Sequence, residues 1–203
     1  MNRLRNWAAF VTLVTALAAC GPAASNRSGE PSVASSAVAS DGQASVGVGA
    51  SLSPGAVADL EAWIPDTVAS MTMQKQSMAG DAYAKKFGDL AIEAMLEDLG
   101  VAPSDASVAI GVGISPALNL SARMLVIRAP GAESGQLDEA FKTATNGVRP
   151  TPLQWAATSI GDKHVESAAD GPATYYLYVK GDVIVFLVPS DHNVAAEIIS
   201  VLP

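Results

Sequence analysis

Cysteine is almost absent from this chain, because Cys20 is the only one among 203 residues. A single cysteine cannot close an internal disulfide or supply the several thiolates of a zinc or iron–sulfur site. Histidine is nearly as scarce, with only His164 and His192. The ligand spacings His-Glu-x-x-His for zinc, Asp-x-Asp-x-Asp for calcium and Gly-x-x-x-x-Gly-Lys for phosphate are also missing. The sequence therefore predicts no bound metal and no cofactor.

Positive charge is in short supply as well. Twelve Lys and Arg residues stand against 20 Asp and Glu residues, which gives a net charge of −8. Such a chain repels phosphate backbones and gains nothing from counterion release, so the composition argues against nucleic acid as a partner. Anionic lipid head groups should be repelled for the same reason.

What is present begins at the N-terminus, where two arginines precede an apolar run over residues 7–19 that ends directly before Cys20. The run is shorter than the roughly 20 residues that cross a bilayer, and it has the length of a secretory h-region. Charge, apolar length, small residues and the cysteine together resemble the signal peptide and lipobox of bacterial lipoproteins. In that family a peptidase cuts just before the cysteine, whose thiol carries a diacylglycerol group.

The resemblance implies that residues 1–19 are a signal peptide, recognised by the peptidase through Leu17, Ala18 and Ala19. It also implies that Cys20 is lipidated, and that the mature protein is anchored in a membrane of the cell envelope, outside the cytoplasm. Each buried methylene of an acyl chain contributes about 0.8 kcal/mol, so two chains make a stable anchor.

Residues 20–55 combine this cysteine with a segment rich in Ala, Ser and Gly, in which Leu52 is the only large apolar residue. Such a composition buries too little surface to offset its ordering entropy, so we expect a flexible tether spanning on the order of 30 Å. Residues 56–203 are long enough for a single domain that buries about two-thirds of its unfolded surface. This domain is similar to other secreted bacterial domains of unknown role, a likeness that implies no functional residues.

Apolar spacings in the domain predict the element order α-β-α-β-β-α-β-β-β-β-α. The clearest signals are two hairpins that turn at Gly161-Asp162 and Gly181-Asp182, followed by a helix capped at Ser190-Asp191. One strand within 67–77 and one helix over 81–99 are expected earlier. Because hairpins outnumber long crossovers, we expect an α+β fold with an antiparallel sheet of about six to seven strands and helices packed mainly on one face.

The two histidines are the candidates for catalysis. His164 lies between two acidic residues at a predicted hairpin tip, where a carboxylate would orient it as a general base, although a solvated turn explains the same charges. Ser190-Asp191-His192 holds the residue types of a serine hydrolase, but sequence neighbours cannot form that relay. No Gly-x-Ser-x-Gly elbow is present, so we assign no catalytic residue.

Two further groups of side chains suggest binding. Tyr175, Tyr176 and Tyr178 are candidates for a binding surface, since aromatics are enriched at interfaces, although buried tyrosines are the alternative. On a strand, Tyr176 and Tyr178 share one face and Tyr175 takes the other. Met71, Met73 and Met78 offer soft sulfur of the kind that selects Cu(I), but core packing is the ordinary use of methionine, and no metal site is assigned.

The sequence thus favours a lipid-anchored envelope protein whose domain is a non-enzymatic binding or accessory module for a protein or other envelope component. A carrier of lipid or another apolar ligand is an alternative, since Gly111, Gly113, Ala156 and Ala157 would leave room between helices and sheet. A hydrolase using His164 or His192 is the second alternative.

Overall fold

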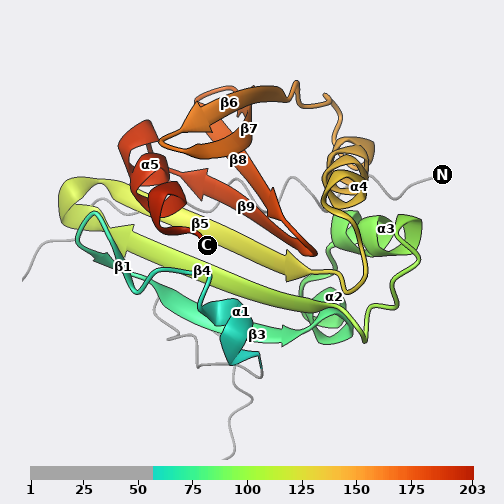
Figure 1. Cartoon of the computed structure of the whole chain (residues 1–203). Helices are drawn as coiled ribbons and strands as arrows, with labels where there is room; N and C mark the ends of the chain where they lie inside the picture. The colour runs from blue at the N-terminus through green and yellow to red at the C-terminus, as the bar shows by residue number, and fades with distance from the viewer. Residues whose placement is uncertain (1–56) are drawn as a thin grey trace, which may run out of the picture. The chain divides into compact units, whose positions relative to one another are not determined.

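The computed structural model describes residues 57–203, in which five α-helices and nine strands are assigned (Figure 1). The helices are α1 (Ala58–Glu61), α2 (Gly80–Phe87), α3 (Leu90–Asp98), α4 (Ser134–Gly147) and α5 (His192–Val201), with a short 3₁₀ turn at Pro116–Leu118. The strands are β1 (Thr67–Val68), β2 (Met71–Thr72), β3 (Gln74–Ala79), β4 (Ser107–Ser115), β5 (Leu120–Arg128), β6 (Ala156–Ile160), β7 (Lys163–Asp170), β8 (Ala173–Lys180) and β9 (Val183–Pro189).

Seven of the strands form one sheet in the order β3-β4-β5-β9-β8-β7-β6, and every neighbouring pair is antiparallel. The remaining two, β1 and β2, pair with each other as a separate small hairpin. The predicted α+β class and the antiparallel sheet are therefore confirmed. The central pair joins β5 to β9, two strands that lie about 60 residues apart in the sequence.

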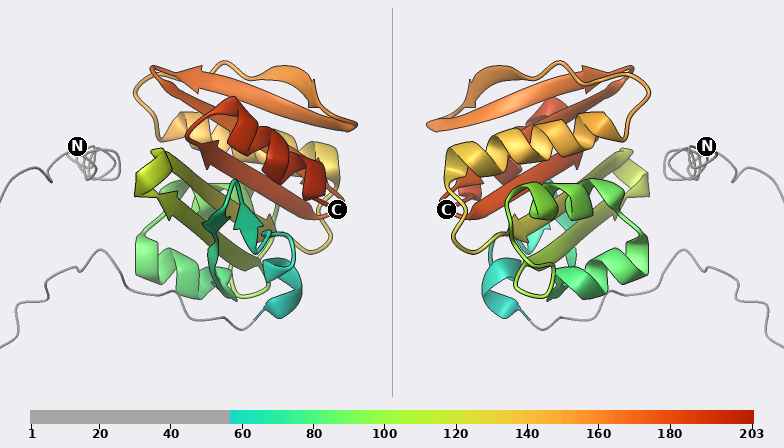
Figure 2. Two further views of the ribbon diagram at one scale, coloured as in Figure 1. Left: turned by 90° about the vertical axis from the view of Figure 1, so that its left-hand side faces the viewer. Right: turned by 90° about the vertical axis from the view of Figure 1, so that its right-hand side faces the viewer.

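The helices lie on both faces of the sheet, as the two side views of Figure 2 show. Most helical residues belong to α2, α3 and α4, which pack together on one face over Val108, Ile127 and Ile184. The opposite face is closed by α1, α5 and the β1–β2 hairpin, and its core includes Met124 and Val185. The alternation of side chains along each strand supplies both apolar layers.

The long helix expected over 81–99 is divided in two. Gly88 adopts a left-handed conformation (φ 61°) and ends α2. Asp89 then caps α3 by accepting hydrogen bonds from the backbone N–H groups of Ala91 and Ile92, and it also accepts one from the Tyr83 hydroxyl at 3.1 Å. Gly88 followed by the capping residue Asp89 is thus a signal for the end of one helix and the start of the next, within an apolar pattern that by itself predicts one continuous helix.

The strand expected within 67–77 is likewise interrupted. Ala69 and Ser70 form the two-residue turn between β1 and β2, and both have positive φ, at 46° and 64°. This conformation matches a tight hairpin, but it is uncommon for residues other than glycine, asparagine and aspartate. Val68 and Met71 on either side of the turn are buried, so the core holds both arms of the hairpin.

Candidate functional site

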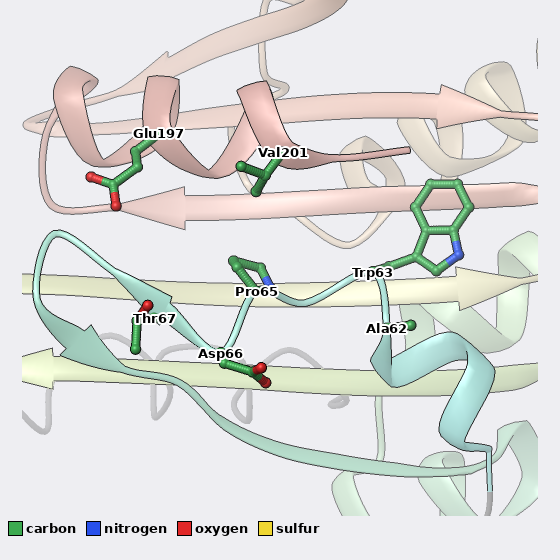
Figure 3. Close-up of a pocket in the computed structure, with 7 residues that line it drawn as sticks. All are labelled: Ala62, Trp63, Pro65, Asp66, Thr67, Glu197 and Val201. Carbon is green, nitrogen blue, oxygen red and sulfur yellow. The ribbon is translucent and has the colours of Figure 1, made fainter.

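An open cleft of about 320 Å³ lies between α5 and the loop that connects α1 to β1 (Figure 3). Trp63 and Pro65 line it from the loop, and Glu197 and Val201 line it from α5. Figure 3 shows the α5 side chains projecting towards the loop. Trp63 is half-buried and packs against the core, whereas Val201 keeps 61 % of its surface exposed. The cleft therefore presents an apolar surface that makes up about half of its lining, and the other half is polar.

Carboxylates flank this apolar surface. Asp66 is almost fully exposed and pairs with Lys75 at 2.7 Å, and the hydrogen bond from Lys75 lowers the pKa of Asp66 below its ordinary value. Glu197 accepts a hydrogen bond of 2.8 Å from the backbone N–H of Ala69. Through this bond α5 holds the strained turn of the β1–β2 hairpin in place, and strain of this kind persists only where its surroundings fix it.

A second open cleft, of about 730 Å³, adjoins the first on the other side of the same loop. Ala62, Pro65 and Asp66 line both clefts, while Glu61 and Lys75 line only the second. Neither lining contains a histidine, serine or cysteine. A loop that lines two adjoining hollows and places a half-buried indole in the first of them is suited to contact another molecule rather than to activate a nucleophile.

The sheet beneath these clefts has no spare volume at its two glycines. A Cβ on Gly111 would lie 2.6 Å from Ile64 Cγ2, and one on Gly113 would lie 2.5 Å from Met73 Sδ. The room that the sequence suggested for an apolar ligand is therefore filled by Ile64 and Met73. The other two small residues, Ala156 and Ala157, lie exposed on the edge strand β6 instead of between layers.

The structure does not place either histidine in the clefts described above. His164 is exposed on β7, where its Nδ1 lies 3.4 Å from the hydroxyl of Ser159, and no carboxylate is among its hydrogen-bond partners in residues 57–203. His192 begins α5, and its Nδ1 lies 3.1 Å from the Tyr176 hydroxyl. Asp191 caps the helix by accepting from the N–H groups that follow, as the sequence indicated for this position.

The three tyrosines are divided between the two faces of the sheet. Tyr176 and Tyr178 are buried beside α5, and the Tyr178 hydroxyl donates to the carbonyl of Pro203. Tyr175 lies on the face of α4, where it stacks on Phe186 and Arg149 covers its ring. The tyrosines therefore do not form one common binding surface.

The methionines are also separated. Met71 and Met73 belong to the core beneath α5, while Met78 packs on the face of α2. In the part of the chain that the structure describes, there is no cluster of three or more His, Cys, Asp or Glu residues able to hold a metal ion.

The predicted lipidation site Cys20 and the recognition residues Leu17, Ala18 and Ala19 lie outside the described residues. Between residues 57 and 203, no helix has the length and apolarity needed to span a bilayer.

Sequence reasoning missed the cleft altogether. Its residues come from a loop near residue 65 and from a helix more than 130 residues later, so no local spacing marks them. The one local feature that could have indicated the cleft is Trp63, a large aromatic residue in the short loop between α1 and β1. Comparison of the chain with protein-family models, with curated proteins and with solved structures gives no significant match.

Proposed function

We propose that this chain is a lipid-anchored protein of the cell envelope, held by Cys20, whose domain binds another envelope protein and catalyses no reaction. The cleft of Figure 3 is the contact site in this proposal. The anchor rests on the lipobox pattern of the sequence, and the binding role rests on the geometry around Trp63.

The observation that carries the binding role is an accessible indole beside an exposed aliphatic side chain, with carboxylates at the rim. Tryptophan is enriched among the residues that dominate binding energy at protein interfaces. Trp63 packs against the core, so little side-chain entropy would be lost when a partner covers it. Asp66 and Glu197, in a chain of net charge −8, favour a partner surface that is neutral or basic.

The test is crosslinking in intact cells, with a photoreactive amino acid at Thr67, which is exposed and lines the cleft. We expect one protein to be crosslinked well above its abundance. Both Trp63→Ala and Val201→Glu should reduce that product at least about tenfold, since loss of a central contact costs more than about 1.4 kcal/mol.

The matched control is Leu90→Glu, which changes another exposed aliphatic residue on the opposite face of the sheet and should leave the crosslink intact. Because Trp63 also packs on the core, its variant is accepted only if its melting temperature stays near that of the native protein. Crosslinks that follow abundance alone, or that persist in Val201→Glu, would refute the proposal.

A further inference from the structure

The sheet ends in a strand edge that is unusually open. β6 is the last strand, and within residues 57–203 it pairs with β7 only. Four of its five residues are exposed: Ala156, Ala157, Thr158 and Ser159. In an antiparallel pair, alternate backbone N–H and C=O groups of an edge strand point away from its partner. One side of β6 therefore offers unpaired donors and acceptors.

The opposite edge of the sheet carries the features that normally prevent strand addition. β3 contains Lys75, and Lys86 of α2 reaches back to the side chain of Gln76 at 3.0 Å. Ser77 of β3 is buried and accepts a hydrogen bond from the backbone N–H of Val57. β6 has no charge, no proline and no large exposed side chain. Native edges are usually protected by such devices, so their absence from β6 marks it as a site for pairing.

Next to this edge lies a group of acidic side chains with one cation. Lys142 Nζ of α4 lies 2.6 Å from Asp138 Oδ2, 3.0 Å from Glu166 Oε2 and 3.4 Å from Glu139 Oε1. Three carboxylates around one ammonium leave a formal charge of −2. Glu139 is mostly exposed, while the other two carboxylates are half-buried. Burial raises the pKa of Asp138 despite the neighbouring ammonium of Lys142, and the charges of Glu166 and Glu139 act in the same direction.

The strand register connects the two features. Glu166 on β7 is directly opposite Ala157 on β6, so both side chains lie on the face of α4. A strand added outside β6 would be about 9.5 Å from β7, two strand spacings away. In the register of the sheet the small side chain of Ala157 lies between this strand and Glu166, and a lysine or arginine side chain is long enough to pass over its methyl group.

We propose that β6 accepts an extended segment of a partner protein as an eighth strand, and that a basic side chain of this segment reaches across Ala157 to Glu166 and Glu139. Main-chain hydrogen bonds would supply the affinity and the acidic group would select the partner, as in other cases of strand addition. This surface shares no residue with the cleft around Trp63, so the result of testing one proposal does not decide the other.

The test uses the full chain in detergent and two capped peptides of alternating Thr and Val, one with a central Lys and one with a central Glu. Hydrogen-exchange mass spectrometry reports on residues 156–160, and peptide anisotropy gives the affinity. The Lys peptide should slow exchange in 156–160 and bind at least about fivefold more tightly than the Glu peptide, given the usual worth of a cross-strand charge pair.

Two variants and a control test the assignment. Ala157→Lys should abolish binding of the Lys peptide, because it fills the path and neutralises the carboxylates, whereas Ser200→Lys adds the same charge on exposed α5 and should have no effect. Glu139→Gln changes an exposed residue without threatening the fold and should weaken binding about twofold or more. Trp63→Ala should leave peptide binding unchanged.

Three results would overturn the inference. One is unchanged exchange in 156–160 at roughly 1 mM Lys peptide, where even a weak complex forms. Another is equal affinity for the Lys and Glu peptides. The third is full protection of 156–160 without peptide in a dimer that Ala157→Lys dissociates, because a second copy of the chain would then occupy the edge.

Discussion

Substitution of Gly111 by alanine tests how the sheet is closed beneath the candidate cleft. Gly111 does not lie in the left-handed region of backbone conformation, so alanine fits its backbone and the effect of the change on the folded state is one of packing. The new methyl carbon would lie 2.6 Å from Ile64 Cγ2 and 3.3 Å from Ile64 Cδ1. Ile64 is β-branched and 99 % buried, so it has little freedom to move away.

The expected cost follows from these contacts. An extra methyl group in a filled core usually costs about 1–3 kcal/mol. Replacing glycine also lowers the conformational entropy of the unfolded chain, which stabilises the folded protein by about 0.4–1 kcal/mol. Gly111→Ala should therefore lower the free energy of unfolding by about 1–2 kcal/mol, which for a domain of this size lowers the melting temperature by roughly 2–8 °C.

Urea denaturation followed by circular dichroism measures the change. Gly135→Ala is the matched control, because a Cβ at that position of α4 meets nothing within 4 Å. The same substitution should there stabilise the protein by about 0.5–1 kcal/mol through helix propensity. The two glycines should thus respond with opposite signs.

A double-mutant cycle identifies the contact. Ile64→Ala alone should cost about 2–5 kcal/mol, but in the Gly111→Ala background the clash disappears and the combined cost should be about 1–3 kcal/mol below the sum. If Gly111→Ala raises the free energy of unfolding, or if the two changes are additive, Ile64 does not fill the space above Gly111. Side-chain packing would then no longer exclude an apolar ligand at that place.

Further changes probe other parts of the molecule. Ser70→Gly should raise the free energy of unfolding by about 1 kcal/mol, because glycine adopts a φ of 64° without steric cost; a loss of stability in urea titration would contradict this. Asp191→Ala removes the cap of α5 and should cost about 1 kcal/mol by the same assay, whereas no loss would mean that the cap is not formed in solution. Burial opposes the charge of Lys142, but Asp138 and Glu166 outweigh it and hold the pKa of Lys142 above its ordinary value. The contribution of the Lys142 charge to stability is therefore complete below about pH 10.4 and is lost as the pH rises further. The free energies of unfolding of the native protein and Lys142→Met should differ by roughly 1–2 kcal/mol from pH 7 to 10, and the difference should shrink above that. A difference that instead grows would refute the assignment. Cys20→Ser should release the protein from the membrane fraction, and a variant that still fractionates with membranes and keeps its leader would remove the anchor from the proposal.

The sequence predicted the elements whose signals are local. The turns at Gly161 and Gly181 both adopt φ of 61° between strands that pair as expected, because glycine followed by aspartate suits a two-residue hairpin loop. The same holds for the start of α5 at Asp191, where cap and helix lie within four residues of each other. The antiparallel α+β class follows from the number of such hairpins.

The turn at Ala69 and Ser70 shows where that reasoning stopped. Neither residue is typical of a tight turn, and their left-handed conformation is held by Glu197, 128 residues further along the chain. The apolar pattern around them predicted a continuous strand because pattern rules weigh neighbours in sequence and not contacts in space.

The period of side chains in a strand shows which residues share a face, and for this reason Tyr176 and Tyr178 were correctly separated from Tyr175 by the sequence alone. It does not show which helix covers that face, since apolar stripes on α4 and α5 are equally able to pack on either side. In the folded sheet β5 pairs with β9, α4 and α5 lie on opposite faces, and Glu197 and Val201 line the cleft with the loop of Trp63. The hairpins at Gly161 and Gly181, the cap of α5 and the anchor pattern are thus properties of short stretches of sequence, whereas the cleft and the contact of the β1–β2 turn with α5 exist only because distant stretches meet in the fold.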